Sequence, residues 1–216
     1  MTSNNNKTTK TVLVRFVFYT LAFFGLTGSL PLIISNGDIS AFLENGPIEW
    51  LQFTLFACST CILLVFSRSE ECKTRDVFAV LMVLTTLAMI REMDSILDKW
   101  IPIAGWKLPG FICVTAGVIF YLRKRDVLAS QIDAFINTRA FSLLWCGFIV
   151  AVPFAQLVGH GGFLRLLMGD DYNHYYKRFI EELGELAGYL LIFIGCIEAV
   201  LQQKESGNSG SAKSDT

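Results

Sequence analysis

Long apolar runs separated by short polar segments are the main pattern along this chain of 216 residues. A transmembrane α-helix needs about 20 consecutive, mainly apolar residues, and most of these runs approach that length. The pattern predicts an all-α, polytopic membrane helix bundle with about six transmembrane helices. We expect the spans at residues 11–34, 47–66, 77–97, 110–122, 140–158 and 178–200.

The segments outside the apolar runs predict how the chain is divided. Residues 1–10 are rich in Asn and Thr and residues 202–216 in Ser and Gly, so we expect disordered tails at both ends. Residues 11–201 form a single transmembrane helical domain in this interpretation. Residues 126–139 are expected to be a surface or interfacial amphipathic segment, and residues 159–177 a re-entrant or interfacial segment.

Composition supports a membrane protein and narrows its partners. Hydrophobic residues make up 53% of the chain and the mean hydropathy is +0.49, whereas soluble domains are about 45–50% apolar. Membrane lipid is therefore an expected partner, together with another membrane protein or a second copy of the chain. The net charge of −1 gives no basis for nucleic-acid binding. Cys58 and Cys61 form a C-x-x-C pattern inside an apolar run, where packing explains them better than redox or metal chemistry.

The basic residues predict the orientation of the bundle. Lys and Arg favour the cytoplasmic side in short loops. If six spans alternate across the membrane, twelve basic residues fall on the side of the two termini and six on the other side. Both termini are therefore expected to be cytoplasmic, and the compact loops and short tails favour a bacterial inner membrane.

The acidic residues follow the opposite distribution. Eleven of the nineteen acids fall at the outer half of the predicted bundle. Glu49 opens the second span, Glu92 lies near the end of the third, and Glu181 and Glu185 open the sixth. His160 closes the fifth span, so four helices present ionisable groups at one depth. Charged groups inside a span are expensive and indicate a functional site by default.

Three arrangements could relieve the repulsion among carboxylates at that depth: a bound divalent cation, pairing with arginine, or a shared proton. For a catalytic site we expect Glu92, Glu185 and His160. The ligand-binding candidates are Glu49, Arg91, Arg178, Gln52 and Gln156. A site for a divalent cation would use Glu49, Glu92, His160, Glu181 and Glu185. This set of ligands resembles that of carboxylate metal sites in helical bundles.

Four interpretations of this constellation remain open from the sequence. The first is a lipid-directed or metal-dependent membrane enzyme, with one carboxylate as general acid or base and Arg91 or Arg178 holding a phosphate. The second is a transporter or ion-binding protein, and the third a non-enzymatic accessory subunit. In the fourth, the acids, arginines and glutamines form a structural salt-bridge network.

Separately, Gly184 and Gly188 are spaced to permit close helix packing.

Overall fold

The computed structural model describes the backbone of residues 2–34, 42, 46–70 and 72–211, and the side chains of residues 10–29, 42, 46–70 and 72–205. Within these ranges every regular element is a helix, as the sequence predicts. The chain divides into two compact units, Met1–Ala41 and Phe42–Thr216. The first contains α1 (Thr2–Ile34), and the second contains all the other helices.

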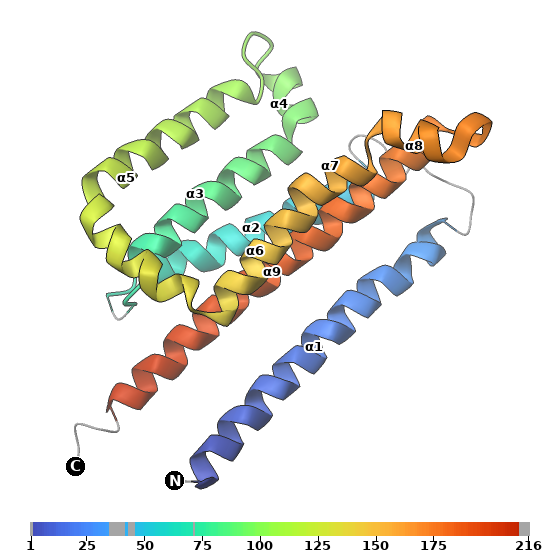
Figure 1. Cartoon of the computed structure of the whole chain (residues 1–216). Coiled ribbons are helices and arrows are strands. Elements are labelled where there is room, and N and C mark those ends of the chain that lie inside the picture. Colours follow the sequence, from blue (N-terminus) through green and yellow to red (C-terminus); the bar gives the residue numbers. More distant parts are fainter. Residues whose placement is uncertain (1, 35–41, 43–45, 71, 212–216) are drawn as a thin grey trace. The chain divides into compact units, whose positions relative to one another are not determined.

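The unit Phe42–Thr216 contains ten helical elements within the described residues (Figure 1). They are α2 (Pro47–Ser67), α3 (Arg75–Glu92), α4 (Asp94–Trp100), α5 (Lys107–Ile136), α6 (Arg139–Ile149), η2 (Val150–Phe154), α7 (Ala155–Val158), α8 (Gly161–Met168), η3 (Gly169–Asp171) and α9 (His174–Ser211). The element η2 is a π-helical turn that contains Pro153. Because proline lacks a backbone N–H, it fits a place where the regular hydrogen-bond ladder is interrupted.

Four described helices are long and apolar enough to cross a membrane: Lys10–Ser29, Pro47–Ser67, Arg139–Val158 and His174–Glu205. They support an integral membrane protein, while the six-span prediction stays a prediction. The third apolar run forms α3 and the separate short helix α4 rather than one helix over 77–97. The fourth predicted span and the predicted interfacial segment after it are one continuous 30-residue helix, α5.

Parts of both predicted tails are helical, because α1 begins at Thr2 and α9 continues to Ser211. Residue 1 and residues 212–216 lie outside the described backbone, as do most residues of the loop 35–45. The division into two tails and one domain therefore stays a prediction. The predicted interfacial segment 159–177 contains α8, η3 and the first turn of α9.

Helix α9 lies beside the rod formed by α6, η2 and α7 (Figure 1), and small residues line the contact between them. A Cβ atom placed on Gly188 of α9 would lie 2.5 Å from the Cβ of Ala151. One placed on Gly184 would lie 3.0 Å from the Cβ of Ala155. Because residue numbers fall along α9 as they rise along α6, η2 and α7, the two helical rods are antiparallel. The close packing predicted from Gly184 and Gly188 is confirmed, and small residues in the facing rod complete it.

Contacts along α2 place it between α3 and α9. Phe56 packs against Tyr189 of α9 with ring centroids 4.4 Å apart, and the Thr60 hydroxyl donates to the Thr85 hydroxyl of α3 at 2.8 Å. Gln52, one turn earlier on α2, bonds to Glu182 of α9. Residue numbers therefore rise together along the two helices, and α2 is parallel to α9. The start of α2, the end of α3 and the start of α9 therefore meet at one end of the unit.

The opposite end of the unit is closed by an apolar core and by polar contacts. Phe78 and Leu128 are buried there beside Ala140 and Cys196, so the ends of α5 and α9 pack together with the starts of α3 and α6. The buried Glu198 carboxylate pairs with Arg139, with Nε and Oε1 3.4 Å apart. This end is therefore held by apolar and ionic contacts, and the polar cavity described below lies at the other end.

Candidate functional site: an acidic cavity at one end of the bundle

A cavity of about 220 Å³ lies where α2, α3, α4 and α9 meet. Its lining contains six carboxylates and three Lys or Arg side chains, so formal negative charge is in excess. The lining residues are Glu49, Arg91, Glu92, Asp94, His174, Lys177, Arg178, Glu181, Glu182 and Glu185. We call this space the acidic cavity.

Local sequence explains how each carboxylate reaches the cavity. Pro47 is a favourable first helical residue, and Glu49 therefore falls in the first turn of α2, where the helix dipole stabilises an anion. Glu181 and Glu185 are one helical turn apart on α9 and can share a face. Glu92 is the last residue of α3, where the dipole disfavours a negative charge. The dipole therefore does not explain the position of Glu92.

Ion pairs neutralise part of the cavity wall. Arg178 Nη2 lies 3.4 Å from Glu49 Oε1, which joins α9 to α2. Arg178 Nε also lies 4.0 Å from Glu182 Oε1, and Lys177 Nζ lies 3.3 Å from Glu181 Oε2. All these side chains are only partly exposed, so the pairs are screened less than surface pairs. This part of the cavity matches the structural network considered from the sequence.

Glu92 and Glu185 differ from Glu49, Glu181 and Glu182 because the hydrogen-bond partners found for them in the described residues are all neutral. The Tyr189 hydroxyl donates to Glu92 Oε1 at 3.0 Å, and Gln156 Nε2 donates to Glu185 Oε1 at 3.4 Å. Neither carboxylate has an ion-pair partner in the described part of the chain. They repel each other, and Arg91 attracts both. Glu185 is 8% exposed, so these two acids form a partly desolvated pair of carboxyl groups beside Arg91.

Two glutamine side chains support the wall of the acidic cavity. Gln156 also donates to Glu181 Oε1 at 3.1 Å, so it holds Glu181 and Glu185 together. Gln52 is fully buried one helical turn from Glu49, and its Nε2 donates to Glu182 Oε2 at 3.1 Å. The Gln52 amide oxygen accepts no hydrogen bond from the described residues. An acceptor without a partner among the described residues therefore lies buried beside Glu182, behind the cavity wall.

The structure brings most of the sequence-predicted site residues together. Those that line the acidic cavity are Glu49, Arg91, Glu92, Arg178, Glu181 and Glu185. Gln52 and Gln156 are bonded to lining carboxylates. Their proximity is established, while the catalytic and binding roles assigned to them stay predictions.

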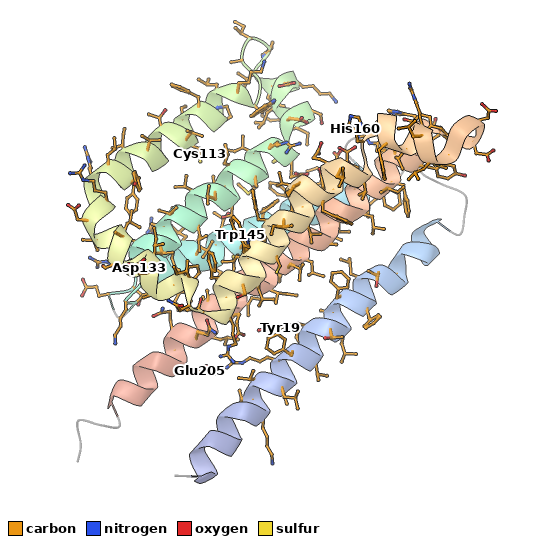
Figure 2. All side chains as sticks on the ribbon, viewed as in Figure 1. Tyr19, Cys113, Asp133, Trp145, His160 and Glu205 are labelled. Atoms are coloured by element: carbon orange, nitrogen blue, oxygen red, sulfur yellow. The ribbon has the colours of Figure 1, made fainter. Side chains whose placement is uncertain are left out.

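His160 does not join this group. It is exposed at the turn before α8, where its Nδ1 accepts from the backbone N–H of Phe163 at 3.4 Å (Figure 2). The imidazole acts there as the N-cap of a short helix. A buried polar position was expected because His160 follows the fifth apolar run directly. The chain turns at Gly159, and this turn carries the ring away from the cavity wall.

The ligand set expected for a divalent cation does not assemble. Within the described residues, no three side chains of His, Cys, Asp or Glu are grouped so that they could hold a metal ion. Glu49 and Glu181 are each engaged by a basic side chain, and His160 lies elsewhere. The five residues proposed from the sequence are therefore not grouped as a ligand set in the described structure, and their metal-binding role stays a prediction.

Five residues of the site are absent from the candidate sets given above. Asp94, His174, Lys177 and Glu182 line the acidic cavity, and Tyr189 binds Glu92. Spacing carried a signal for two of them, because Lys177 precedes Glu181 by four residues and Tyr189 follows Glu185 by four. Asp94 is brought in by the break between α3 and α4, which the apolar pattern did not indicate.

Comparison with known proteins adds no relative from which a role could be transferred. No protein-family model, no curated protein and no solved structure matches the chain. The function must therefore be argued from the acidic cavity itself.

Proposed function

We propose that this chain is a multi-pass membrane protein that binds a small cationic group in its acidic cavity. The observation that carries the proposal is the pair Glu92 and Glu185, which line one cavity with only neutral hydrogen-bond partners. Two carboxylates held in this way attract a positive charge strongly, because partial burial weakens screening by water.

The size and charge of the cavity limit the ligand class. Pockets for drug-sized ligands measure about 300–1,000 Å³, and the acidic cavity measures about 220 Å³. It suits an ammonium group or a comparably small cation. Carboxylates accept hydrogen bonds and cannot donate them when ionised, so an ammonium group with several N–H donors is the best match.

The topology completes the proposal. We count α3 and α5 with the four apolar helices, because the 18 residues of α3 measure about 27 Å along the helix axis. This gives six spans with both termini in the cytoplasm, as the distribution of basic residues predicts. The acidic cavity then opens at the non-cytoplasmic face. The compact loops favour the inner membrane of a bacterium.

A thiol-labelling experiment tests this topology. Ile103 lies at the cavity end, in the turn between α4 and α5, and Ser69 lies at the other end, between α2 and α3. In intact cells a membrane-impermeant maleimide should label an Ile103→Cys variant and leave a Ser69→Cys variant unlabelled. Labelling of the Ser69→Cys variant instead would reverse the orientation, and labelling of both would refute the span assignment.

Ligand binding is tested with the purified full chain in detergent. Methylammonium chloride should raise the midpoint of thermal unfolding of the wild-type protein relative to sodium chloride. A ligand at ten times its dissociation constant stabilises by about 1.4 kcal/mol. Glu92→Gln and Glu185→Gln should each remove this shift, because Gln keeps an acceptor oxygen and the side-chain shape while losing the charge.

Glu70→Gln is the matched control, because Glu70 is an exposed glutamate at the other end of the bundle. It should respond to methylammonium as the wild type does. An equal shift in all four proteins would show a non-specific salt effect and refute the cation site. The absence of any shift in folded wild-type protein would also refute it.

A second candidate function is an enzyme acting on a lipid or a lipid-linked group. It is favoured by the hydrogen bond from the Tyr189 hydroxyl to Glu92, which joins two groups able to exchange a proton, next to Arg91. Glu92→Gln would then alter the membrane lipid profile of the host, whereas a Glu70→Gln host would keep the wild-type profile. Equal profiles in both hosts would exclude this candidate.

A further inference from the structure

We propose that the natural ligand of the acidic cavity is a membrane lipid whose headgroup carries both a primary ammonium and a phosphate. This inference rests on the proposed cation site and names its ligand. Three features of the described residues support it: acceptors for an ammonium, an arginine for a phosphate, and an adjoining apolar crevice.

The ammonium half is matched by acceptors in the wall of the acidic cavity and by one buried directly behind it. Glu92 and Glu185 supply carboxylate oxygens. Gln52 supplies a buried amide oxygen that accepts no hydrogen bond from the described residues, and this amide is bonded to Glu182 of the cavity wall. A primary ammonium donates three hydrogen bonds, whereas a quaternary ammonium donates none. The acceptors therefore favour an ethanolamine-type headgroup over a choline-type one.

The phosphate half is matched by Arg91. Lys177 and Arg178 are engaged by Glu181, Glu182 and Glu49. Arg91 also lines the acidic cavity, but it is exposed and has no ion-pair partner within the described residues. A guanidinium binds phosphate oxygens through two parallel N–H donors. A simple inorganic cation would be repelled by this guanidinium, whereas the phosphate of a zwitterionic headgroup would bind it.

The apolar part of the ligand is matched by a shallow crevice of about 10 Å³ beside the acidic cavity. Its walls are Trp50, Phe53, Met93 and Ile96, and it shares Glu49 and Glu92 with the acidic cavity. The crevice lies between the start of α2 and the junction of α3 with α4. Trp50 is 48% exposed and lies at this end of the bundle. Tryptophan is enriched at the ends of membrane-spanning helices, at the interface with water.

The polar and apolar spaces share Glu49 and Glu92 in their walls, and this neighbourhood favours a lipid over a soluble zwitterion. Free phosphoethanolamine would fill the acidic cavity and leave the crevice without a role. A lipid would place its headgroup in the cavity and the first part of its glycerol and acyl region along Trp50 and Phe53. The structure thus favours a lipid, and the soluble headgroup becomes one arm of the test.

The experiment measures binding of short-chain lipids to the purified full chain by native mass spectrometry and by thermal shift. The probes are dihexanoyl phosphatidylethanolamine, phosphatidylcholine and phosphatidylglycerol, and free phosphoethanolamine. The ethanolamine lipid should bind at least about tenfold more tightly than the glycerol lipid, because one charge-assisted hydrogen bond already corresponds to about that factor. It should also bind more tightly than the choline lipid and the free headgroup.

Two variants separate the parts of the site. Arg91→Gln should weaken binding of the ethanolamine lipid about tenfold or more. It should not weaken the response to methylammonium, because it removes a positive charge that competes for Glu92 and Glu185. Trp50→Ala should weaken binding of the lipid but not of free phosphoethanolamine. Trp145→Ala is the control for loss of a half-exposed tryptophan, since Trp145 is 53% exposed on α6 (Figure 2).

The outcomes distinguish this inference from the proposed function. If methylammonium binds through Glu92 and Glu185 but the three lipids bind equally, the cation site stands and the lipid inference is refuted. Equal binding of phosphoethanolamine and its lipid, unaffected by Trp50→Ala, refutes the lipid and favours a soluble ligand. If neither methylammonium nor the ethanolamine lipid binds, both proposals fail.

Discussion

Replacing Gly188 with alanine is expected to separate α9 from the rod formed by α6, η2 and α7. The added Cβ would lie 2.5 Å from the Cβ and 2.7 Å from the Cα of Ala151, and closest of all to its backbone nitrogen. Backbone atoms cannot rotate away as a flexible side chain can, so one helix must shift. The same displacement would loosen the hydrogen bonds that Gln156 makes to Glu181 and Glu185.

The expected change in the free energy of unfolding is the difference between a steric cost and a gain in helix propensity. Overpacking a close-packed interface costs about 1–3 kcal/mol, and replacing glycine by alanine in a helix returns roughly 0.5–1 kcal/mol. We therefore expect a net loss of about 0.5–2 kcal/mol in the free energy of unfolding. Gly184→Ala should cost less, because its nearest contact is the Cβ of Ala155 at 3.0 Å.

The assay compares three alanine variants by thermal or denaturant unfolding in one detergent. Gly25→Ala is the reference, since a Cβ at Gly25 would meet nothing within 4 Å. The expected order of stability is Gly25→Ala, then Gly184→Ala, then Gly188→Ala. If Gly188→Ala proved as stable as Gly25→Ala, the close approach of the two helices would be refuted.

Three further substitutions test polar contacts, each measured by the same unfolding assay. Tyr189→Phe removes the hydroxyl that Glu92 accepts from, and should cost about 1–3 kcal/mol because a partly buried carboxylate loses a donor. Gln131→Leu should cost a similar roughly 1–3 kcal/mol, because Gln131 accepts from the Asp76 N–H and donates to its carboxylate, both at 3.0 Å. Glu198→Gln should cost less than the about 3–5 kcal/mol of a fully buried pair, because its arginine partner at the start of α6 remains partly exposed. A change of less than about 0.5 kcal/mol in any of the three, the range of ordinary surface substitutions, would contradict the corresponding contact.

Parts of the site were predictable from the sequence because the direction of successive helices constrains them. Glu49 opens one apolar run, Glu92 closes the next helix along the chain, and Glu181 opens the last one. Antiparallel neighbours joined by a short turn bring the end of one helix beside the start of the other. The sequence could therefore assign these acids to one end of the bundle, but it could not show whether Glu92 faces the cavity or the lipid.

His160 and Tyr189 show what the pattern could not decide. His160 follows the fifth apolar run at the expected depth, yet the turn at Gly159 makes it the cap of a short surface helix. The sequence pattern does not distinguish Tyr189 from the apolar residues around it in α9. The rotation of that helix nevertheless directs its hydroxyl to Glu92. Helix rotation is set by contacts between distant segments, such as Gly188 with Ala151, and no local periodicity records it.

The sequence by itself determined that the chain is helical and membrane-associated, because uninterrupted apolar runs can satisfy their backbone hydrogen bonds in a bilayer only within helices. It also determined which acids share one end. Only the tertiary structure decided that Glu92 and Glu185 line a common cavity, that α5 is continuous and that His160 stands apart. The physical reason is that apolarity and spacing are local properties of the chain. The direction in which each side chain points depends instead on how closely two helices can approach.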